Sequence, residues 1–402
     1  MAVSVGLDDV AQLLALIAGL GAAAASLVAV LGAIAVRAFA ARARPEPRRW
    51  PPVTVLKPLC GDEPMLHAAL ATICRQDYPA LQIVFGVRDE ADPALAVARA
   101  IQRQFPGRDI SVVVDRRLHG ANRKISNLIN MLPAARHDVL IFSDSDLHVP
   151  PDYVAQVVAA LEVPEVGLVT TLCVGLPTSP GLIARLGATA ITHSFLPGVL
   201  LGRCLGRQDC LGTTMALRRA TLDRVGGLGG LVDHLADDQV LADNIRYFGL
   251  SVGLAGVVTQ TAVPEHSWHA LLQHELRWAR TVRAAIPWGF VTSTLQFPLF
   301  WAAMYVLLSG GAAWSAMAFA ASWIVRAVAA WCVDGALRLR PGGSLAPFAL
   351  LPLRDLLSVG QVVVSYLGRR VVWRGHVMYV ESSADMPPTE MAQPAEAMPP
   401  AG

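Results

Sequence analysis

The feature that most constrains the fold of this chain is a long apolar stretch close to its N-terminus. Residues Val10 to Val36 consist almost entirely of Ala, Leu, Val, Ile and Gly. At about 1.5 Å per residue, a helix of this length crosses the roughly 30 Å hydrocarbon core of a bilayer. A buried core helix is the alternative, but such helices are rarely so long and so uniform. The stretch therefore predicts a membrane-spanning helix.

The charges that flank this stretch predict its orientation. Asp8 and Asp9 precede it, whereas arginines follow it at positions 37, 42, 44, 48 and 49. Because basic residues favour the cytoplasmic side of a membrane, the chain beyond residue 37 is expected in the cytoplasm. An acidic start and a long apolar run are also atypical of a cleaved signal peptide.

Composition narrows the class of protein further. The net charge is only +2, which gives no case for nucleic-acid binding. The six cysteines show neither a CxxC motif nor a Cys/His zinc spacing, so free thiols in a reducing compartment are expected. The chain has 402 residues, which leaves room for one catalytic domain and additional membrane segments.

Strand-like and helix-like segments alternate after a proline-rich linker at residues 44–52. The expected strands are 53–56, 83–87, 110–114, 139–142 and 166–171, and the expected helices are 63–77, 93–104, 122–134 and 151–161. This order predicts a mostly parallel sheet with helices on both faces. Ligands of such sheets bind beyond the carboxyl ends of the strands.

Carboxylates stand at those strand ends. Asp144 and Asp146 follow the apolar strand 139–142 and are separated by one serine. In an extended segment both would point to the same side, as a shared metal ion requires. A Mg²⁺ or Mn²⁺ ion held there could neutralise a diphosphate. The alternative is a solvated turn, because this short pattern often occurs by chance.

A second strand end carries Asp89, three residues before Asp92 and Pro93. A carboxylate there could accept hydrogen bonds from a base or a ribose, and the alternative is a helix N-cap. Since an acid directly before proline suits the N-cap, we assign capping to Asp92 and nucleotide contact to Asp89.

Later residues supply further candidates. Asp237 and Asp238 open a helical stretch, where they could complement the helix dipole or remove a proton from an attacking hydroxyl, and Asp238 is preferred as that base. Arg277 could pair with a diphosphate, and Trp278 could stack on an acceptor or line the sugar pocket. Both also suit an amphipathic helix at a membrane surface. Lys124 could reach a donor phosphate or be an ordinary exposed helix residue.

The apolar segments after these motifs are less regular. Residues 181–206 are interrupted by charge and proline, which favours an interfacial helix or an acceptor channel over a span. Phe290–Ser309 and Ala312–Val333 are candidate spans, although Arg326 lies in the second. Residues 344–367 contain Arg354 and Asp355, so a re-entrant or surface-lying segment is preferred there. Residues 381–402 are expected to be disordered.

These motifs together resemble ceramide glucosyltransferase and its bacterial relatives, which are glycosyltransferases of the GT-A fold. The carrying segments are Leu56–Leu59, Asp77–Pro79, Arg88–Pro93, Asn122–Asn127, Asp144–Ser145, Gly226–Leu228, Ala236–Asp238 and Arg277–Trp278. The resemblance runs from about Val53 to Trp278. It implies a Rossmann-like mixed sheet, nucleotide contact by Asp89, a metal at Asp144 and a base at Asp238. His274 departs from the family pattern, which usually has Gln or Arg there.

The resemblance implies a function and a layout. Residues 1–40 would be an N-terminal transmembrane anchor, 50–288 a cytoplasmic catalytic domain, 289–380 a C-terminal membrane region and 381–402 a tail. The enzyme would sit in a bacterial inner membrane and use a UDP-sugar donor and a lipid acceptor. The chain looks most like the bacterial hopanoid-biosynthesis glycosyltransferases, which attach N-acetylglucosamine to bacteriohopanetetrol.

Other classes stay open at this point. Ceramide glucosylation from UDP-glucose is the close alternative, because nothing in the residues decides the acceptor. A polysaccharide synthase is disfavoured by the few candidate spans, since a polymer channel needs more helices. A membrane scaffold that merely retains the fold is disfavoured by the intact acids at Asp89, Asp144 and Asp238.

Overall fold

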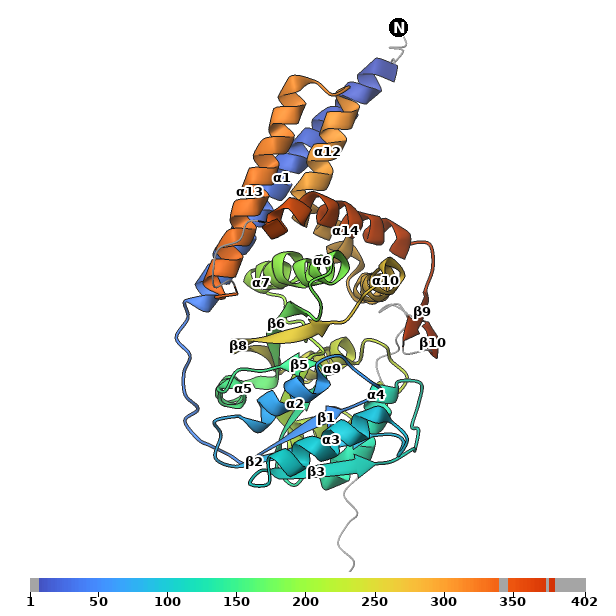
Figure 1. Cartoon of the computed structure of the whole chain (residues 1–402). Coiled ribbons are helices and arrows are strands. Elements are labelled where there is room, and N and C mark those ends of the chain that lie inside the picture. The colour runs from blue at the N-terminus through green and yellow to red at the C-terminus, as the bar shows by residue number, and fades with distance from the viewer. Residues whose placement is uncertain (1–6, 340–345, 374–375, 380–402) are drawn as a thin grey trace, which may run out of the picture.

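The protein consists of an α/β body that carries a bundle of long helices on one side (Figure 1). The structure, a computed structural model, describes residues 7–339, 346–373 and 376–379. The strands are β1 Val53–Pro58, β2 Leu81–Val87, β3 Asp109–Val114, β4 Val139–Ser143, β5 Leu147–His148, β6 Val166–Pro177, β7 Thr214–Arg218, β8 Ser251–Val263, β9 Arg370–Trp373 and β10 His376–Tyr379. The expected disordered tail at 381–402 lies outside the described residues.

The helices fall between these strands and beyond them. They are α1 Leu7–Ala40, α2 Leu66–Cys74, α3 Pro93–Gln104, α4 Arg123–Met131, α5 Tyr153–Leu161, α6 Leu182–Ala190, α7 Leu196–Cys204, α8 Arg219–Arg224, α9 Asp237–Tyr247, α10 Trp268–Ala285, α11 Pro287–Thr292, α12 Pro298–Leu308, α13 Ala313–Ala336 and α14 Leu351–Ser365. A π-helical turn, η2 Ile191–Phe195, joins α6 to α7.

The main sheet is mixed rather than mostly parallel. Its strand order is β3-β2-β1-β4-β7-β6-β8-β5. The half from β3 to β4 is parallel, as predicted, but β7 pairs antiparallel with both β4 and β6, and β5 pairs antiparallel with β8. The second half departs from the simple βα alternation, so its connections no longer force parallel neighbours.

Alternating side chains of the central strands fill two separate cores. In β4, Val139 and Ile141 face the core shared with α2, α3 and α5, whereas Leu140 and Phe142 face the core shared with α4 and α9. Both faces are therefore covered, which explains why these strands are continuously apolar in sequence. The predicted strands and helices up to residue 171 are all present, with β6 extending further to Pro177.

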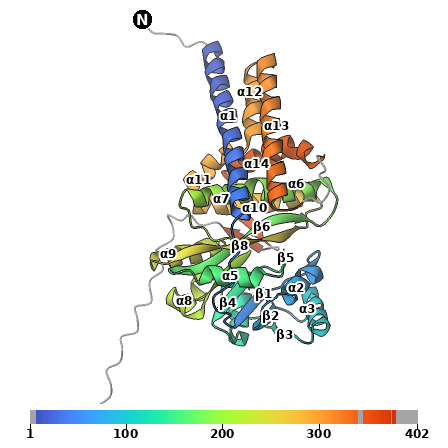
Figure 2. The same ribbon diagram turned by 90° about the vertical axis from the view of Figure 1, so that its left-hand side faces the viewer.

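Helix α1 leads away from this body and packs against α12 and α13 (Figure 2). Its contact side is built from small buried residues such as Ala18, Ala22 and Ala25, whereas Leu16 and Leu20 are exposed. Small residues let membrane helices approach closely, and exposed leucines suit contact with lipid. Asp9–Ala40 and Ala313–Ala336 are both long and apolar enough to cross a membrane.

The predicted span Phe290–Ser309 is not one straight helix. It is divided into Pro287–Gln296 and Pro298–Leu308, which meet at an angle of 71°. Phe297, the residue before Pro298, has φ −117° and ψ 71°, which is outside the helical region. Proline both lacks an N–H donor and disfavours a helical conformation in its predecessor, so the chain bends at this point.

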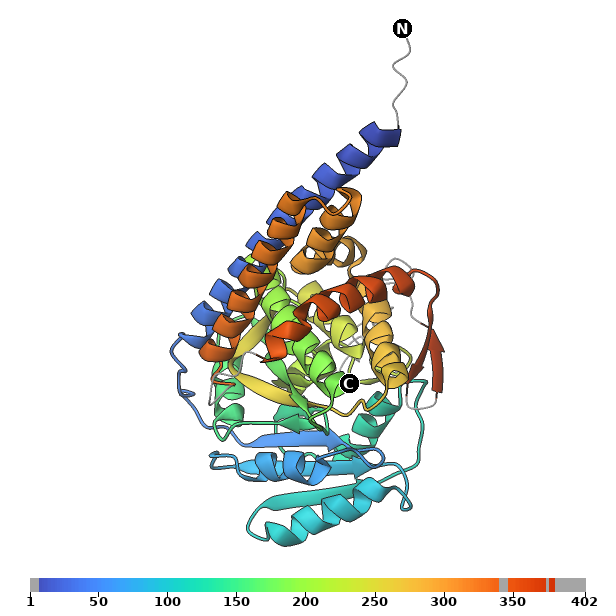
Figure 3. The ribbon, with the colours of Figure 1, turned by 45° about the horizontal axis from the view of Figure 1, so that its top comes forward.

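Helix α14 lies across the base of the bundle and above α6 and α10 (Figure 3). Its region Phe348–Ser365 has the length and composition of a span. Its direction across the bundle nevertheless supports the surface-lying alternative. Helices α6, α7 and α10 form a layer between α14 and the sheet (Figure 1), which supports the prediction of an interfacial helix at 181–206.

The charged residues within these apolar helices are buried in pairs. Arg326 of α13 lies 3.4 Å from Asp355 of α14. Arg354 of α14 binds Glu275 of α10 with contacts of 2.6 and 2.9 Å. His193 of η2 lies 2.7 Å from Asp334 of α13. We refer to these six residues as the bundle-base cluster: Arg326, Asp355, Arg354, Glu275, His193 and Asp334. The charges at 326, 354 and 355 thus join helices to one another.

Candidate active site

Asp144 and Asp146 lie in a tight turn between β4 and β5, not in the extended segment that their spacing predicted. Strand β4 pairs with β7 through Ser143, whereas β5 pairs with β8 through Leu147. Because these partners occupy different positions in the sheet, the backbone must turn over Asp144–Asp146. The turn nonetheless stands at the carboxyl end of β4, where the sequence placed the site.

Lys124 links this turn to the acids of α9. Its Nζ lies 2.7 Å from Asp144 Oδ1 and 3.9 Å from Asp237 Oδ2, and it donates to the Gly212 carbonyl oxygen at 3.0 Å. Burial alone would lower the pKa of Lys124, but Asp144 and Asp237 outweigh burial and hold it above its ordinary value. Lys124 is therefore a fixed cation that gathers acids from distant parts of the chain.

Lys57 supports the same turn from below. Its fully buried Nζ donates to Ser143 Oγ at 3.0 Å and to the Asp144 carbonyl oxygen at 2.5 Å. Burial lowers the pKa of Lys57 to about 8, although Asp146 and Asp144 act in the opposite direction. The only two lysines of the chain thus both contact the Asp144–Asp146 turn.

Asp146 is held by the neighbouring strand. Thr261 of β8 donates its hydroxyl to Asp146 Oδ2 at 2.7 Å. Burial and the nearby Asp144 raise the pKa of Asp146 to about 6. A cation placed beside Asp146 would stabilise the ionised form of its carboxyl group.

The carboxylates at the turn suit a divalent ion that is held partly by substrate phosphates. Among the described residues, no group of three or more His, Cys, Asp and Glu side chains could hold a metal ion. Mg²⁺, however, is commonly bound through one or two carboxylates together with substrate phosphates, rather than in an all-protein cage. Asp144 and Asp146 suit that mode of binding, because burial and the charge of Asp144 disfavour an ionised Asp146 without a cation beside it. A diphosphate would then complete the ligands of the ion.

Asp237 and Asp238 differ in their surroundings although they are adjacent. Asp237 is buried and accepts a hydrogen bond from Asn122 Nδ2 at 3.2 Å. Asp238 is partly exposed, and its Oδ1 accepts a hydrogen bond from the Gln239 backbone N–H at 2.8 Å. A Cβ on Gly212 would come within 2.9 Å of Asp238 Oδ2, so the glycine leaves room for this carboxylate.

The electrostatics of Asp238 suit a proton acceptor. Burial and the adjacent Asp237 raise the pKa of Asp238 to about 7, against the opposing effect of Lys124. Burial likewise raises the pKa of Asp237 above its ordinary value. A general base works best when its pKa lies near the working pH, and Asp238 meets that condition.

Asp89 lies at the exposed end of β2 and is bound to a cation. Arg116, after β3, donates to Asp89 Oδ1 at 2.8 Å. The pKa of Asp89 is lowered by a hydrogen bond from the Ala91 N–H and by Arg116. Asp92 caps α3, accepting a hydrogen bond from the Ala94 N–H, as predicted. Asp89 is therefore ionised and accessible, and its contact with a nucleotide stays a prediction.

Trp278 lies in α10 and lines a cavity of about 70 Å³ between α10, α6 and η2. Its ring packs edge-on against His274 at a centroid distance of 4.8 Å and near Phe195 at 6.2 Å. Arg277 precedes Trp278 on the same helix. Burial opposes the shift, but the hydrogen bond with His274 lowers the pKa of Glu265, and the charge of Arg277 acts in the same direction. A contact of Arg277 with diphosphate stays a prediction.

Sequence reasoning missed several residues of this region. Lys57 lies in one of the segments that carry the family resemblance. Nothing in the neighbouring sequence, however, predicts that its side chain is buried beneath the Asp144–Asp146 turn. The contribution of Thr261 depends on the pairing of β5 with β8, which connects residues far apart in the chain. Glu265 binds His274 from outside any recognised motif. None of the six cysteines, all of which lie in the described part of the chain, forms a disulfide.

Comparisons with known proteins bear on this arrangement. The family model described as Glycosyl transferase family 21 matches residues 17–386. Ceramide glucosyltransferase 1 of Caenorhabditis elegans is 23% identical over 258 residues, which are 63% of this chain and 54% of that protein. Ceramide glucosyltransferase of Komagataella phaffii is 31% identical over 121 residues, which are 29% of this chain and 24% of that protein. The chain thus spans about half, or less, of the length of these curated relatives.

A solved structure shares the fold. It is the mannosyltransferase PcManGT from Pyrobaculum calidifontis in complex with GDP-Man and Mn²⁺. The two structures align with a TM-score of 0.50 at 22% identity, over 88% of this chain and 99% of that chain. The mixed sheet with its covering helices is accordingly of the GT-A type.

Proposed function

Because the chain belongs to glycosyl transferase family 21, we propose that it is an inverting, metal-dependent membrane glycosyltransferase. It moves N-acetylglucosamine from UDP-N-acetylglucosamine to a hydroxyl of bacteriohopanetetrol, a hopanoid lipid. Residues 50–288 form its catalytic domain on the cytoplasmic side of a bacterial inner membrane. Residues 1–40 and 289–380 attach that domain to the membrane.

The observation that carries the proposal is the convergence of acids on Lys124. This residue contacts Asp144 of the turn and Asp237 of α9 at once, so the expected metal carboxylates and the expected base share one site. Sugar transfer requires that proximity, because the acceptor must attack the carbon that the diphosphate leaves.

In the proposed reaction, Asp238 takes the proton of the acceptor hydroxyl. The hydroxyl oxygen forms a bond to the anomeric carbon while the bond from that carbon to the diphosphate oxygen breaks. UDP leaves with the bonding electrons, and the anomeric configuration is inverted because the displacement is direct. The raised pKa of Asp238, about 7, suits this proton transfer near neutral pH.

The donor side of the site is built to receive phosphate and cation together. Asp144 and Asp146 would hold Mg²⁺ or Mn²⁺, which would neutralise charge on the leaving diphosphate. Lys124, ionised by its acidic neighbours, adds a fixed positive charge. Asp89 is proposed to contact the nucleoside, and Arg277 and Trp278 the diphosphate and the sugar or acceptor.

The acceptor is assigned to the membrane side of the domain. The layer of α6, α7 and α10 lies between the sheet and the bundle (Figure 1), which suits access by a lipid. Similarity to ceramide glucosyltransferases supports a lipid as acceptor. Ceramide with UDP-glucose is the second candidate. A polysaccharide synthase is the least favoured, since the described residues hold three candidate spans, or four with the bent pair counted.

The decisive experiment offers both lipids to the same enzyme. Purified full-length protein in detergent is incubated with Mg²⁺ and a mixture of UDP-sugars, with bacteriohopanetetrol and ceramide in separate tubes. Lipid products are identified by mass spectrometry. We expect a hexosamine-sized adduct on the hopanoid, and loss of product after exhaustive chelation.

Other outcomes would change the assignment. A hexose on ceramide would replace the hopanoid with a sphingolipid as acceptor. Transfer that survives exhaustive chelation would remove the metal from the mechanism. An Asp238→Ala protein that folds and retains full activity would remove Asp238 as the base.

A further inference from the structure

The cavity beside Trp278 is lined mainly by apolar side chains, but the carboxylate of Glu265 also lies against it. Glu265, which follows β8, is 8% exposed and lines the cavity. Its Oε1 binds His274 Nδ1, but its buried Oε2 has no hydrogen-bond partner among the described residues. A buried charged oxygen without a partner is costly, so its position calls for a ligand that donates a hydrogen bond.

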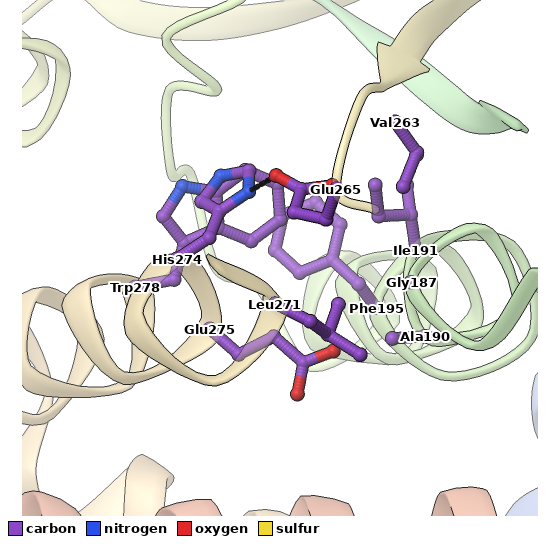
Figure 4. Close-up of a pocket in the computed structure, with 10 residues that line it drawn as sticks. All are labelled: Gly187, Ala190, Ile191, Phe195, Val263, Glu265, Leu271, His274, Glu275 and Trp278. Atoms are coloured by element: carbon purple, nitrogen blue, oxygen red, sulfur yellow. Dashed lines mark hydrogen bonds and ion pairs between the residues drawn. The ribbon is translucent and has the colours of Figure 1, made fainter. Parts of the chain in front are cut away.

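The rest of the cavity is apolar and aromatic. In Figure 4, the Glu265 carboxylate meets the His274 ring on one side, while Ile191, Leu271 and Phe195 surround the space beside it. The Glu275 carboxylate points away from Glu265 in the same view. The cavity thus combines one acceptor oxygen with carbon-lined walls, a combination that suits a hydroxyl and the carbon atoms next to it.

We propose that Glu265 and His274 form the headgroup subsite for the lipid acceptor, in which Glu265 Oε2 accepts a hydrogen bond from a lipid hydroxyl. The apolar walls receive the carbon atoms next to that hydroxyl, which is as much of a lipid as a cavity of about 70 Å³ accommodates. This inference rests on the proposed function, and it assigns the acceptor class as a hydroxyl-bearing amphiphile. Glu265 and His274 are binding residues here, distinct from the base Asp238.

Strand β8 connects this subsite to the reaction centre. Thr261, which binds Asp146, precedes Glu265 by four residues. At roughly 3.3 Å per residue, the two positions are at most about 13 Å apart along the chain. A lipid headgroup held at Glu265 can therefore present a more distant hydroxyl towards the Asp144–Asp146 turn.

The helix that carries His274 is also tied to the membrane side. Arg354 of α14 binds the Glu275 carboxylate with two contacts, and Leu271 of α10 is fully buried. These contacts fix the face of α10 that closes the cavity. His274 therefore sits on a rigid helix, and Glu265 lies in the short connection that joins β8 to that helix.

The test measures lipid binding without a UDP-sugar. Radiolabelled bacteriohopanetetrol, ceramide and a hopane without hydroxyls are each bound to the purified full-length protein in detergent. We expect the tetrol to bind at least about tenfold more tightly than the hopane, as one charge-assisted hydrogen bond allows. Glu265→Gln should remove most of that preference while binding of the hopane stays unchanged.

Two further variants separate the subsite from general damage. Ala190→Leu fills the cavity without altering Glu265 and should weaken both hopanoids equally. Glu90→Gln makes the same chemical change at an exposed position and should leave the preference intact. Gel filtration and thermal melting establish that each variant is folded.

The outcomes are distinct from those of the proposed function. An unchanged preference in folded Glu265→Gln, or a wild-type protein that binds neither tetrol nor ceramide, overturns the subsite. Ceramide binding that depends on Glu265 supports the subsite and favours the sphingolipid acceptor. A wild-type protein that releases no UDP from any UDP-sugar refutes the proposed function alone, since binding is measured independently.

Discussion

The acids of the candidate site and those of the bundle-base cluster differ in how basic residues compensate their charge. In the bundle-base cluster each acid has a basic side chain of its own as partner: Asp355 has Arg326, Glu275 has Arg354, and Asp334 has His193. At the site, Asp144, Asp146, Asp237 and Asp238 share Lys124 and Lys57. The first region is balanced, whereas the second has an excess of negative charge.

This difference indicates what each region is for. Paired charges between helices fix how those helices pack, and removing one member leaves a buried charge behind. At the site, burial together with the charge of a neighbouring carboxylate instead raises the pKa, as at Asp238 and Asp146. Under the proposed function, a divalent cation and a diphosphate would relieve this unfavourable arrangement. Perturbed pKa values of this kind are typical of functional sites.

The sharpest way to test the comparison is Asp238→Asn. We expect transfer to fall by about 10² to 10⁴, since a general base is lost. We also expect the variant to be more stable than the wild type at pH 8. The wild-type pKa of Asp238, about 7, lies above the unfolded value near 4. The folded state therefore binds more protons, and stability falls as pH rises from about 4 to 7.

The measurement is thermal melting at pH 5 and pH 8 beside an activity assay. The stabilisation by Asp238→Asn should be larger at pH 8 than at pH 5. An Asn variant that is less stable at pH 8 than the wild type would contradict the assignment of excess charge to the site.

Arg326→Met is the corresponding change in the bundle-base cluster and should have the opposite effect. It leaves the buried Asp355 without its cation, so we expect a loss of about 3 to 5 kcal/mol in unfolding free energy. Melting in detergent measures the loss. Arg326→Met combined with Asp355→Leu should recover much of it, because both charges are then gone. Failure of that recovery would mean that Arg326 acts through His193 and Ser194 instead.

Lys124→Met tests the shared cation. Without it, Asp237 and Asp144 act unopposed on Asp238, whose pKa should rise further. We expect activity at pH 7 to fall by roughly tenfold and to recover partly above pH 8, because a nearby opposite charge typically shifts a carboxyl pKa by about one unit or more. A pH–rate profile measures the shift. An equal loss at every pH would limit Lys124 to donor binding.

The smallest change is Gly212→Ala. The added Cβ would lie 2.9 Å from Asp238 Oδ2, so the carboxylate must move by a few tenths of an ångström. We expect kcat to fall by about tenfold with little change in the KM for the lipid, since positioning of the base is altered. Gly229→Ala, where the Cβ meets nothing within 4 Å, is the matched control and should be fully active.

The sequence predicted the elements whose signals are local. Asp92 followed by Pro93 placed the start of α3, and the predicted helix 93–104 agrees with the observed one. The apolar strands 83–87 and 139–142 placed Asp89 and Asp144 at strand ends. The bend before Pro298 also had a local signal, the proline itself, which length and hydropathy outweighed in the prediction of a single span.

The remaining features depend on contacts between distant residues. Pairing of β7 with β4 and of β5 with β8 converts the Asp144–Asp146 segment into a turn, and no pattern near residue 144 specifies that pairing. Contact of Lys124 with Asp237 joins positions more than a hundred residues apart. Burial of Lys57 and of Glu265 Oε2 is likewise a consequence of the assembled fold.

The length of the segment at the end of strand β8 bears on which hydroxyl of an acceptor would react. Thr261, the third residue from the end of β8, holds Asp146, and Val263 at the end of the strand lies two residues before Glu265. Residues 261–263 pair with β6 and cannot stretch, so this segment would fix the distance between the proposed headgroup anchor and the proposed reaction centre. Regioselectivity along a polyol is then set by backbone length, and lengthening this segment would move glycosylation to a different carbon.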